Sequence, residues 1–204
     1  MDIQLNLVNN SNSDDPSVVI FQKNVATNFD EFVIAWKVIR IFGQGDNHPF
    51  VFPIGMQIGA SDSWGNHIPG LNANTGELYH VTLTGSGDTL SYLCPATSPT
   101  KIQLKNGLAV GAINADIYKN ERLLATQTSI APGQMAAFEF KPTIWIGVVN
   151  QVMEGEGMNS AILSDINTEI SLLGIAKADI VMTGGGPGPS SIPYTFTLQN
   201  VVTA

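Results

Sequence analysis

Two glycine-rich segments of the chain each place a carboxylate close to an imidazole. The first spans residues 43–49 (GQGDNHP) and the second residues 62–67 (DSWGNH). A divalent metal binds imidazole nitrogen and carboxylate oxygen, and loops can bring such ligands together around an open position for water. A third histidine lies on a predicted strand. The candidate metal ligands are therefore Asp46, His48, Asp62, His67 and His80.

The spacing of these residues matches no established metal motif, because the carboxylate and imidazole stand at i,i+2 in the first segment and at i,i+5 in the second. Asp, Asn, Gly and His also favour turns for conformational reasons alone. We therefore expect solvated turns and no cofactor. A metal-dependent enzyme that uses these His and Asp side chains is the last of three functional hypotheses.

Trp64 has an unusual setting for a tryptophan, since it stands between Ser63 and Gly65 in a polar loop. An exposed indole can stack on a sugar ring or enter a lipid interface, and the polar side chains beside it could hydrogen-bond to sugar hydroxyls. Burial of the indole beneath its own loop is the slightly favoured alternative. The predicted ligand-binding residues are Asp62, Trp64, Asn66 and His67.

Other candidates for catalysis are weaker. Glu154 and Glu156 flank a single glycine, as in a solvated loop, and Asp165 and Glu169 would share an exposed face if their segment were helical. Residues 59–63 (GASDS) lack the final glycine of a nucleophile elbow. The sequence therefore favours a protein that is not an enzyme.

The balance of charge restricts the partners of the protein. The chain has 9 basic and 17 acidic residues, a net charge of -8, and no Lys or Arg between residues 41 and 100. Nucleic acids and anionic membranes require clustered Lys and Arg, so both are disfavoured. A glycan or a neutral lipid remains as a partner.

Low charge density also favours self-association. Only 13% of residues are charged while 44% are hydrophobic, against about 25% charged in an average soluble domain. Like charges keep proteins apart in solution, so we expect a homo-oligomer.

Cys94 is the only cysteine, which excludes an internal disulfide, and it is expected to pack as a small buried hydrophobe.

The pattern along the chain predicts strands almost throughout. Residues 3–7 alternate apolar and polar side chains, residues 32–42 are rich in β-branched and aromatic residues, and Lys119 to Arg122 form a hairpin turn. Only residues 160–166 are compatible with a helix. The glycine-rich segment 184–191 is expected to form a long flexible turn with an exposed tip.

These elements predict an all-β protein, an antiparallel β-sandwich with little helix. We expect a single domain over residues 1–204. A weak internal similarity, in which a Lys-Asn turn precedes Trp36 and another precedes Trp145, raises the alternative of two similar halves packed together, residues 1–98 and 99–204.

The start of the chain lacks the basic and apolar regions of a secretory signal, so synthesis in the cytoplasm is expected, with non-classical release as a later step. The apolar runs are too short to predict a transmembrane helix.

The first functional hypothesis is a non-enzymatic binding or self-assembling protein. The second is a pore-forming, toxin-like protein that docks on membranes through loop aromatics such as Trp64.

Overall fold

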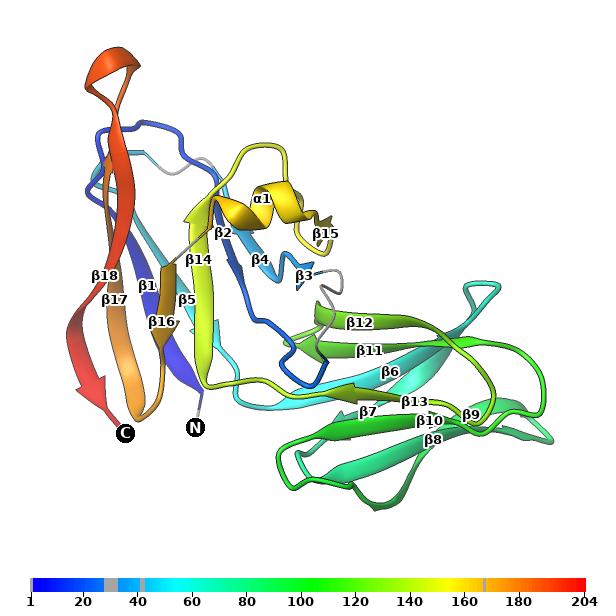
Figure 1. Ribbon diagram of the computed structural model, residues 1–204. Coiled ribbons are helices and arrows are strands. Elements are labelled where there is room, and N and C mark those ends of the chain that lie inside the picture. The colour runs from blue at the N-terminus through cyan, green and yellow to red at the C-terminus, as the bar shows by residue number, and fades with distance from the viewer. Residues whose placement is uncertain (1, 28–32, 41–42, 167) are drawn as a thin grey trace. The chain divides into compact units, whose positions relative to one another are not determined.

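The computed structural model describes residues 2–27, 33–40, 43–166 and 168–204 (Figure 1). It confirms the predicted all-β fold, because nearly all regular structure in these residues is strand. The chain divides into two compact units. Unit 1 contains residues 1–22, 34–54 and 142–204, and unit 2 contains residues 23–33 and 55–141.

Unit 1 is built from two four-stranded sheets, with the strand orders β18-β17-β1-β5 and β16-β14-β2-β4. Strand β1 pairs with β17 in parallel, and the other neighbours are antiparallel. The strands are β1 (Ile3–Asn9), β2 (Val18–Phe21), β4 (Lys37–Ile39), β5 (Asn47–Phe52), β14 (Thr143–Val148), β16 (Thr168–Ser171), β17 (Ile175–Gly185) and β18 (Ile192–Thr203), with β15 (Gly157–Met158) as a further short strand.

The core of unit 1 follows directly from the sequence pattern. Along β1 the side chains of Ile3, Leu5 and Leu7 are buried, whereas the polar residues between them lie on the outer face. Trp36 is buried, as predicted, and its ring meets Phe52 edge to face at 5.4 Å. Trp145 is only half-buried and stacks on Phe21 with ring centroids 6.4 Å apart.

The described residues of unit 1 contain two short helical elements. They are α1 (Ser160–Ser164) and the 3-10 turn η1 (Gly188–Ser190). The first lies within the one segment predicted to be helical. Its N-terminus is capped by Asn159, whose Oδ1 accepts a hydrogen bond from Ile162 N at 3.0 Å. No helix in the described ranges is long and apolar enough to cross a membrane.

Unit 2 also contains two sheets, with the strand orders β12-β11-β6-β7 and β13-β10-β8-β9. A short strand, β3 (Val33–Ile34), pairs with β12 through Val33 and Ala125. The remaining strands are β6 (Met56–Asp62), β7 (His67–Ala73), β8 (Glu77–Thr84), β9 (Gly87–Pro95), β10 (Ile102–Asn106), β11 (Ile113–Lys119), β12 (Arg122–Ile130) and β13 (Met135–Phe138).

The two units share one feature of topology. Each combines an antiparallel sheet with a sheet whose two central strands run parallel, β1 with β17 in unit 1 and β8 with β10 in unit 2. Neither parallel pair was expected from the sequence.

The halves considered from the sequence do not coincide with the units, because residue 98 lies inside unit 2 and unit 1 draws on both ends of the chain. The single domain over residues 1–204 stays a prediction.

The predicted hairpin at Lys119 to Arg122 is confirmed. It joins β11 to β12, and its two turn residues, Asn120 and Glu121, have φ angles of 49° and 63°. Two consecutive positive φ angles match the right-handed twist of the flanking strands.

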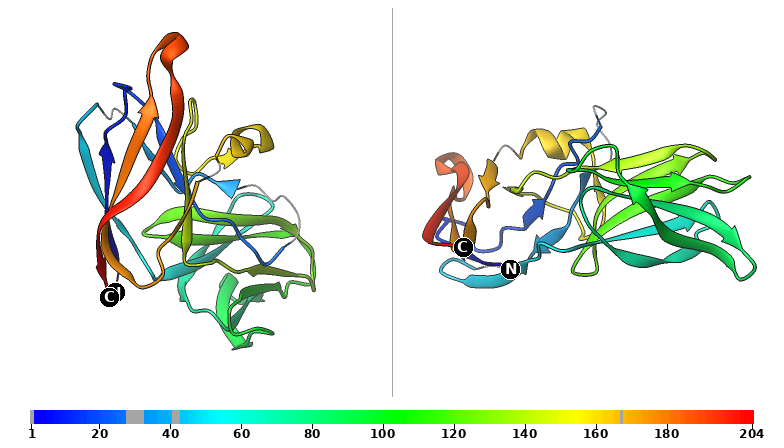
Figure 2. Two further views of the ribbon diagram at one scale, coloured as in Figure 1. Left: turned by 60° about the vertical axis from the view of Figure 1, so that its left-hand side comes forward. Right: turned by 90° about the horizontal axis from the view of Figure 1, so that it is seen from below.

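Strand pairing gathers several turns at one end of unit 2 (Figure 2). Asp62 pairs with Ile113, Ile113 pairs with Ile130, and Asn106 lies beside Val81. The strands that these residues terminate or begin therefore share this end. We call it the loop end of unit 2, and it consists of residues 62–66, 84–87, 107–112 and 131–134.

The buried side chain of Asn106 ties this end together. Its Nδ2 donates to the carbonyl oxygens of Gly111 and Ile130, each at 2.8 Å, and its Oδ1 accepts from Leu108 N at 3.0 Å. The backbone of Asn106 also bonds to Gly133 and Gln134. One fully buried amide thus satisfies backbone groups of two separate connections.

Replacing Asn106 by Ala should lower the free energy of unfolding by about 2–4 kcal/mol, because three buried or half-buried backbone groups lose their partner. Urea denaturation measures the change. Asn72→Ala is the matched control, since Asn72 is exposed on β7, and it should change stability by less than about 0.5 kcal/mol. Equal effects of the two substitutions would contradict the role of Asn106.

Candidate functional site

The β6–β7 turn is organised by the carboxylate of Asp62. Its Oδ1 accepts hydrogen bonds from the backbone N–H groups of Trp64 and Asn66, each at 2.8 Å, and its Oδ2 accepts from Asn66 Nδ2 at 2.7 Å. The Asn66 side chain, followed by these backbone donors, lowers the pKa of Asp62. Asp62 and Asn66, which the sequence suggested as ligand-binding groups, therefore bind each other.

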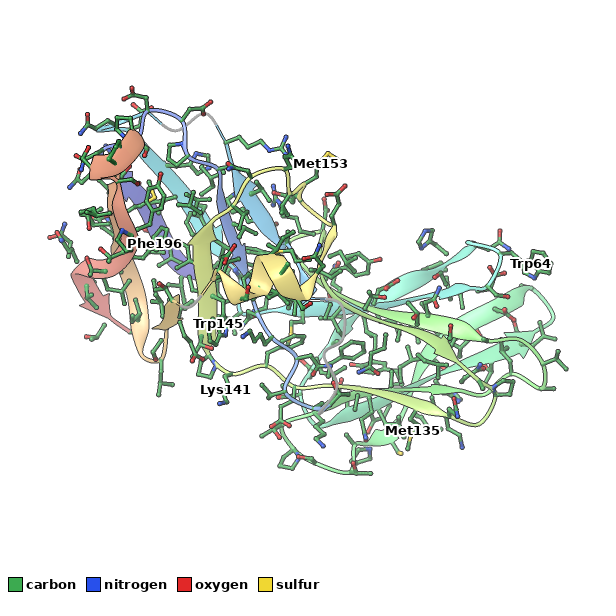
Figure 3. The ribbon with its side chains drawn as sticks, turned by 45° about the horizontal axis from the view of Figure 1, so that its top comes forward. Trp64, Met135, Lys141, Trp145, Met153 and Phe196 are labelled. Atoms are coloured by element: carbon green, nitrogen blue, oxygen red, sulfur yellow. The ribbon has the colours of Figure 1, made fainter. Side chains whose placement is uncertain are left out.

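Trp64 projects from the tip of this turn and is 88% exposed (Figure 3). The favoured alternative, an indole buried beneath its own loop, is wrong. The indole is presented to solvent, and beside it Asp62 and Asn66 are hydrogen-bonded to each other.

The five candidate metal ligands do not form a metal site in the described residues, where no three His, Cys, Asp or Glu side chains lie close enough to hold an ion. Asp46 and His48 belong to unit 1, whereas Asp62, His67 and His80 belong to unit 2.

Asp46, His48 and His80 each occupy a separate place in a turn or on a strand. Asp46 Oδ2 accepts from Gly43 N at 2.9 Å and closes its own turn. His48 is half-buried on β5, where burial and then the charge of Lys37 lower its pKa. His80 is half-buried on β8, between Ser91 and Lys105 on the neighbouring strands.

His67 leads to the site that we consider the best candidate. It lies at the start of β7 on the outer face of the β12-β11-β6-β7 sheet, at the margin of a shallow groove of 390 Å³. The groove crosses β11, β6 and β7. The residues that line it are Gln57, Gly59, Ala60, His67, Ile68, Pro69, Gly70, Tyr118 and Glu121.

Two glycines leave the floor of this groove without side chains. Gly59 lies on β6, and a Cβ atom added to Gly70 on β7 would lie 3.0 Å from the carbonyl oxygen of Ile58. The pairing of β6 with β7 shifts register between Ile58 and Ala60, so the close approach occurs at a β-bulge.

The ring of Tyr118 lies against this floor. A Cβ atom added to Gly59 would be 3.2 Å from Cε2 of Tyr118, so the ring occupies the space of a missing side chain. The hydroxyl donates to Asp116 Oδ2 at 3.4 Å. Burial, together with the charge of Asp116, raises the pKa of Tyr118 to about 12, so the ring is neutral at physiological pH.

The groove therefore offers a half-exposed aromatic ring with polar groups at its margin. Gln57 is opposite Tyr118 across the β6–β11 pair, and His67 pairs with Ser61 two residues beyond Gly59. Such an arrangement can stack on a flat apolar ligand face and bind hydroxyls at its edge.

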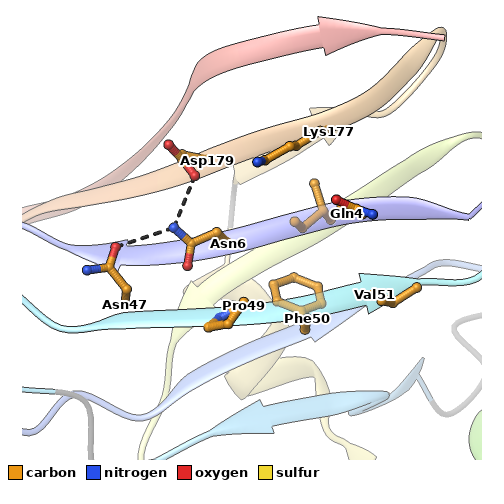
Figure 4. A pocket seen from close by; sticks show the side chains of 9 residues that line it. Gln4, Asn6, Asn47, Pro49, Phe50, Val51, Lys177 and Asp179 are labelled. Atoms are coloured by element: carbon orange, nitrogen blue, oxygen red, sulfur yellow. Dashed lines mark hydrogen bonds between the residues drawn. The ribbon is translucent and has the colours of Figure 1, made fainter.

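A second groove, of 510 Å³, lies on the outer face of the β18-β17-β1-β5 sheet in unit 1 (Figure 4). Its polar side chains largely satisfy one another. Asn6 Nδ2 donates to Asn47 Oδ1 at 3.3 Å and to Asp179 Oδ1 at 3.0 Å, while Asn200 Nδ2 donates to Asp179 Oδ2 at 2.6 Å. Asn200, then Asn6, then the charge of Lys177 lower the pKa of Asp179.

Asn6 Oδ1 in this second groove is shielded from solvent and has no hydrogen-bond partner. The residue opposite on β5 is Pro49, which has no N–H to donate. Because water does not reach the oxygen, a ligand does not reach it either. The second groove also lacks an exposed aromatic ring like that of Tyr118, since its lining aromatic, Phe50, is buried.

Two of the acidic residues considered for catalysis accept hydrogen bonds from backbone N–H groups. Glu154 Oε2 accepts from Val38 N at 3.4 Å, and Glu156 Oε2 accepts from Met153 N at 3.0 Å. Asp165 ends α1, whereas Glu169 lies on β16, so the helical face proposed for this pair does not exist.

The glycine-rich segment 184–191 has the exposed tip that the sequence predicted, at residues 187–190, and is anchored at its base. Asn12 N donates to the carbonyl of Gly184 at 2.8 Å, and Gly186 N donates to Ser13 Oγ at 3.1 Å. The hydroxyls of Ser13 and Tyr194 lie 2.6 Å apart.

Cys94, which was expected to pack as a small buried hydrophobe, is half-buried on β9 and does not belong to the core.

Comparison of the chain with protein-family models, with curated proteins and with solved structures gives no match.

Of the predicted ligand-binding residues, only His67 lines the groove. Three other residues that line the groove were not predicted from the sequence as ligand-binding residues. They are Gly59, Gly70 and Tyr118. A glycine inside a strand pattern indicates a bulge or a close approach, which is the one signal in the sequence that could have identified them. The pairing of Tyr118 with Gln57, which places the ring over this floor, depends on a long-range register.

Asp62→Ala should speed amide hydrogen exchange at Trp64 and Asn66 by roughly fivefold, because both N–H groups lose their acceptor. Exchange measured by NMR at each amide tests this. The matched control is Asp88→Ala in the neighbouring β8–β9 hairpin, which should leave both rates unchanged. Unaltered rates in Asp62→Ala would show that the turn holds its shape without the carboxylate.

Proposed function

We propose that the protein is a non-enzymatic binding protein that recognises a neutral glycan on the outer face of the β12-β11-β6-β7 sheet. The observation that carries this proposal is the position of Tyr118, whose half-exposed ring lies along Gly59 in a groove with polar margins. A pyranose has a face of C–H groups and a rim of hydroxyls, which complement such a groove.

The charges of the groove favour a neutral ligand. Among its lining residues Glu121 is the one charged side chain apart from the titratable His67, and none is Lys or Arg. An acidic sugar or a phosphate would find no cation here, and the chain as a whole carries a net charge of -8.

The same lining residues favour binding without hydrolysis. Glycoside hydrolysis requires two carboxyl groups on either side of the scissile bond. Glu121 is one carboxylate of the groove, while Asp116 is buried and accepts from the Tyr118 hydroxyl. This leaves the groove without an acid and base pair facing a ligand.

Tyr118→Ala should weaken glycan binding by about tenfold or more, because the stacking surface is lost. Tyr118→Phe keeps the ring and should retain most of the affinity. The experiment screens the protein on an array of neutral oligosaccharides and measures the dissociation constant of the strongest ligand by calorimetry.

The control for this experiment is Tyr92→Ala, since Tyr92 is an exposed aromatic on the other sheet of unit 2. It should bind like the unaltered protein. The proposal is overturned if no neutral glycan binds, or if Tyr118→Ala and Tyr92→Ala bind equally well.

A further inference from the structure

Three large apolar side chains stand exposed in the loop end of unit 2 or directly beside it. Trp64 is 88% exposed, Val110 is 85% exposed and Leu83 is 73% exposed. Among the residues that the structure describes, only Leu173, in unit 1, is comparably exposed, at 75%. Single exposed apolar residues are ordinary, but three that project from one end indicate a docking surface.

Strand pairing places the three residues at the same end. Trp64 follows Asp62, which pairs with Ile113, and Val110 precedes Ile113 by three positions. Leu83 lies two residues beyond Val81, which is beside Asn106 at the end of β10, and one residue before the end of β8. Each residue therefore sits in or next to a different turn.

These turns are held in place by hydrogen bonds. Asp62 fixes the backbone around Trp64, and Asn106 binds the connection that carries Val110. Beyond Leu83, Thr84 Oγ1 donates to the carbonyl of Gly87 at 2.8 Å. Turns held in this way give up little backbone freedom on binding.

The loop end carries no positive charge in these turns. Residues 62–67, 83–88 and 107–112 contain no Lys or Arg, and their acidic residues are Asp62 and Asp88. Anionic lipids would therefore be repelled, whereas a zwitterionic surface imposes no electrostatic cost.

The geometry points to a zwitterionic lipid bilayer as the partner of the loop end. We propose that Trp64, Val110 and Leu83 insert into the interfacial region of the bilayer. Apolar tips on separate turns match a fluid surface that adapts to each tip, and an indole is suited to the boundary between headgroups and acyl chains.

This proposal does not depend on the glycan groove. Tyr118 lies at the opposite end of β11 from Ile113, which borders the loop end.

The test measures co-flotation of the protein with phosphatidylcholine vesicles and the emission of tryptophan on vesicle addition. The unaltered protein should float with the vesicles and its emission should shift to the blue. The other two tryptophans, Trp36 and Trp145, lie in unit 1, where Trp36 is buried and Trp145 half-buried and stacked on Phe21, so the shift should disappear in Trp64→Phe. Val110→Ser and Leu83→Ser should each weaken partitioning, and with Trp64→Ala they should reduce it by about tenfold or more.

Leu173→Ser is the matched control, since it removes an equally exposed apolar side chain from unit 1. It should partition normally, and so should Tyr118→Ala. The proposal is overturned if the unaltered protein stays unbound, if Leu173→Ser loses as much binding as Val110→Ser, or if binding requires anionic lipid. Binding of a protein partner at unchanged Trp64 without any vesicle binding would likewise overturn it.

Discussion

The hydrogen bonds of the buried Asn106 amide are the interaction on which the loop end of unit 2 depends. Connections are normally the least ordered parts of a β-sandwich, because their backbone groups are left to water. Here one side chain inside the sandwich supplies partners to Leu108, Gly111 and Ile130. The turns that present Val110 are thereby fixed from within, while their outer surfaces remain apolar.

Asp62 does for the β6–β7 turn what Asn106 does for its neighbours. In both cases the oxygen of a polar side chain accepts hydrogen bonds from backbone N–H groups, from inside the fold for the buried Asn106 and within its own turn for Asp62. The exposed residues of the loop end include the apolar Trp64 and Val110 but also polar residues such as Ser63, Asn66 and Gln134. Unit 2 thus has prominent apolar side chains at the loop end and a separate groove with an aromatic ring.

The local pattern of the sequence was sufficient to predict the all-β fold, because alternation on β1 and the Asn120-Glu121 turn each encode their structure within a few residues. The parallel pairs were not predictable in this way. Leu5 pairs with Ala178, and no local signal connects residues so distant in the chain. The groove was missed for the same reason, since Tyr118 meets Gly59 only after β11 and β6 pair. For Trp64, residue type indicated a platform, but the orientation of Asp62 decided its exposure.

The division of the chain between the units has a consequence for the order of folding during synthesis. All of unit 2 has been made once residue 141 leaves the ribosome, whereas unit 1 still lacks β14, β16, β17 and β18. Strand β1 is made before unit 2, yet its parallel partner β17 is made after it. Because domains fold as their segments become complete, unit 2 can fold before unit 1, and the buried face of β1 must wait for β17. The early strands of unit 1 are thus exposed to chaperones and to aggregation for longer than the strands of unit 2.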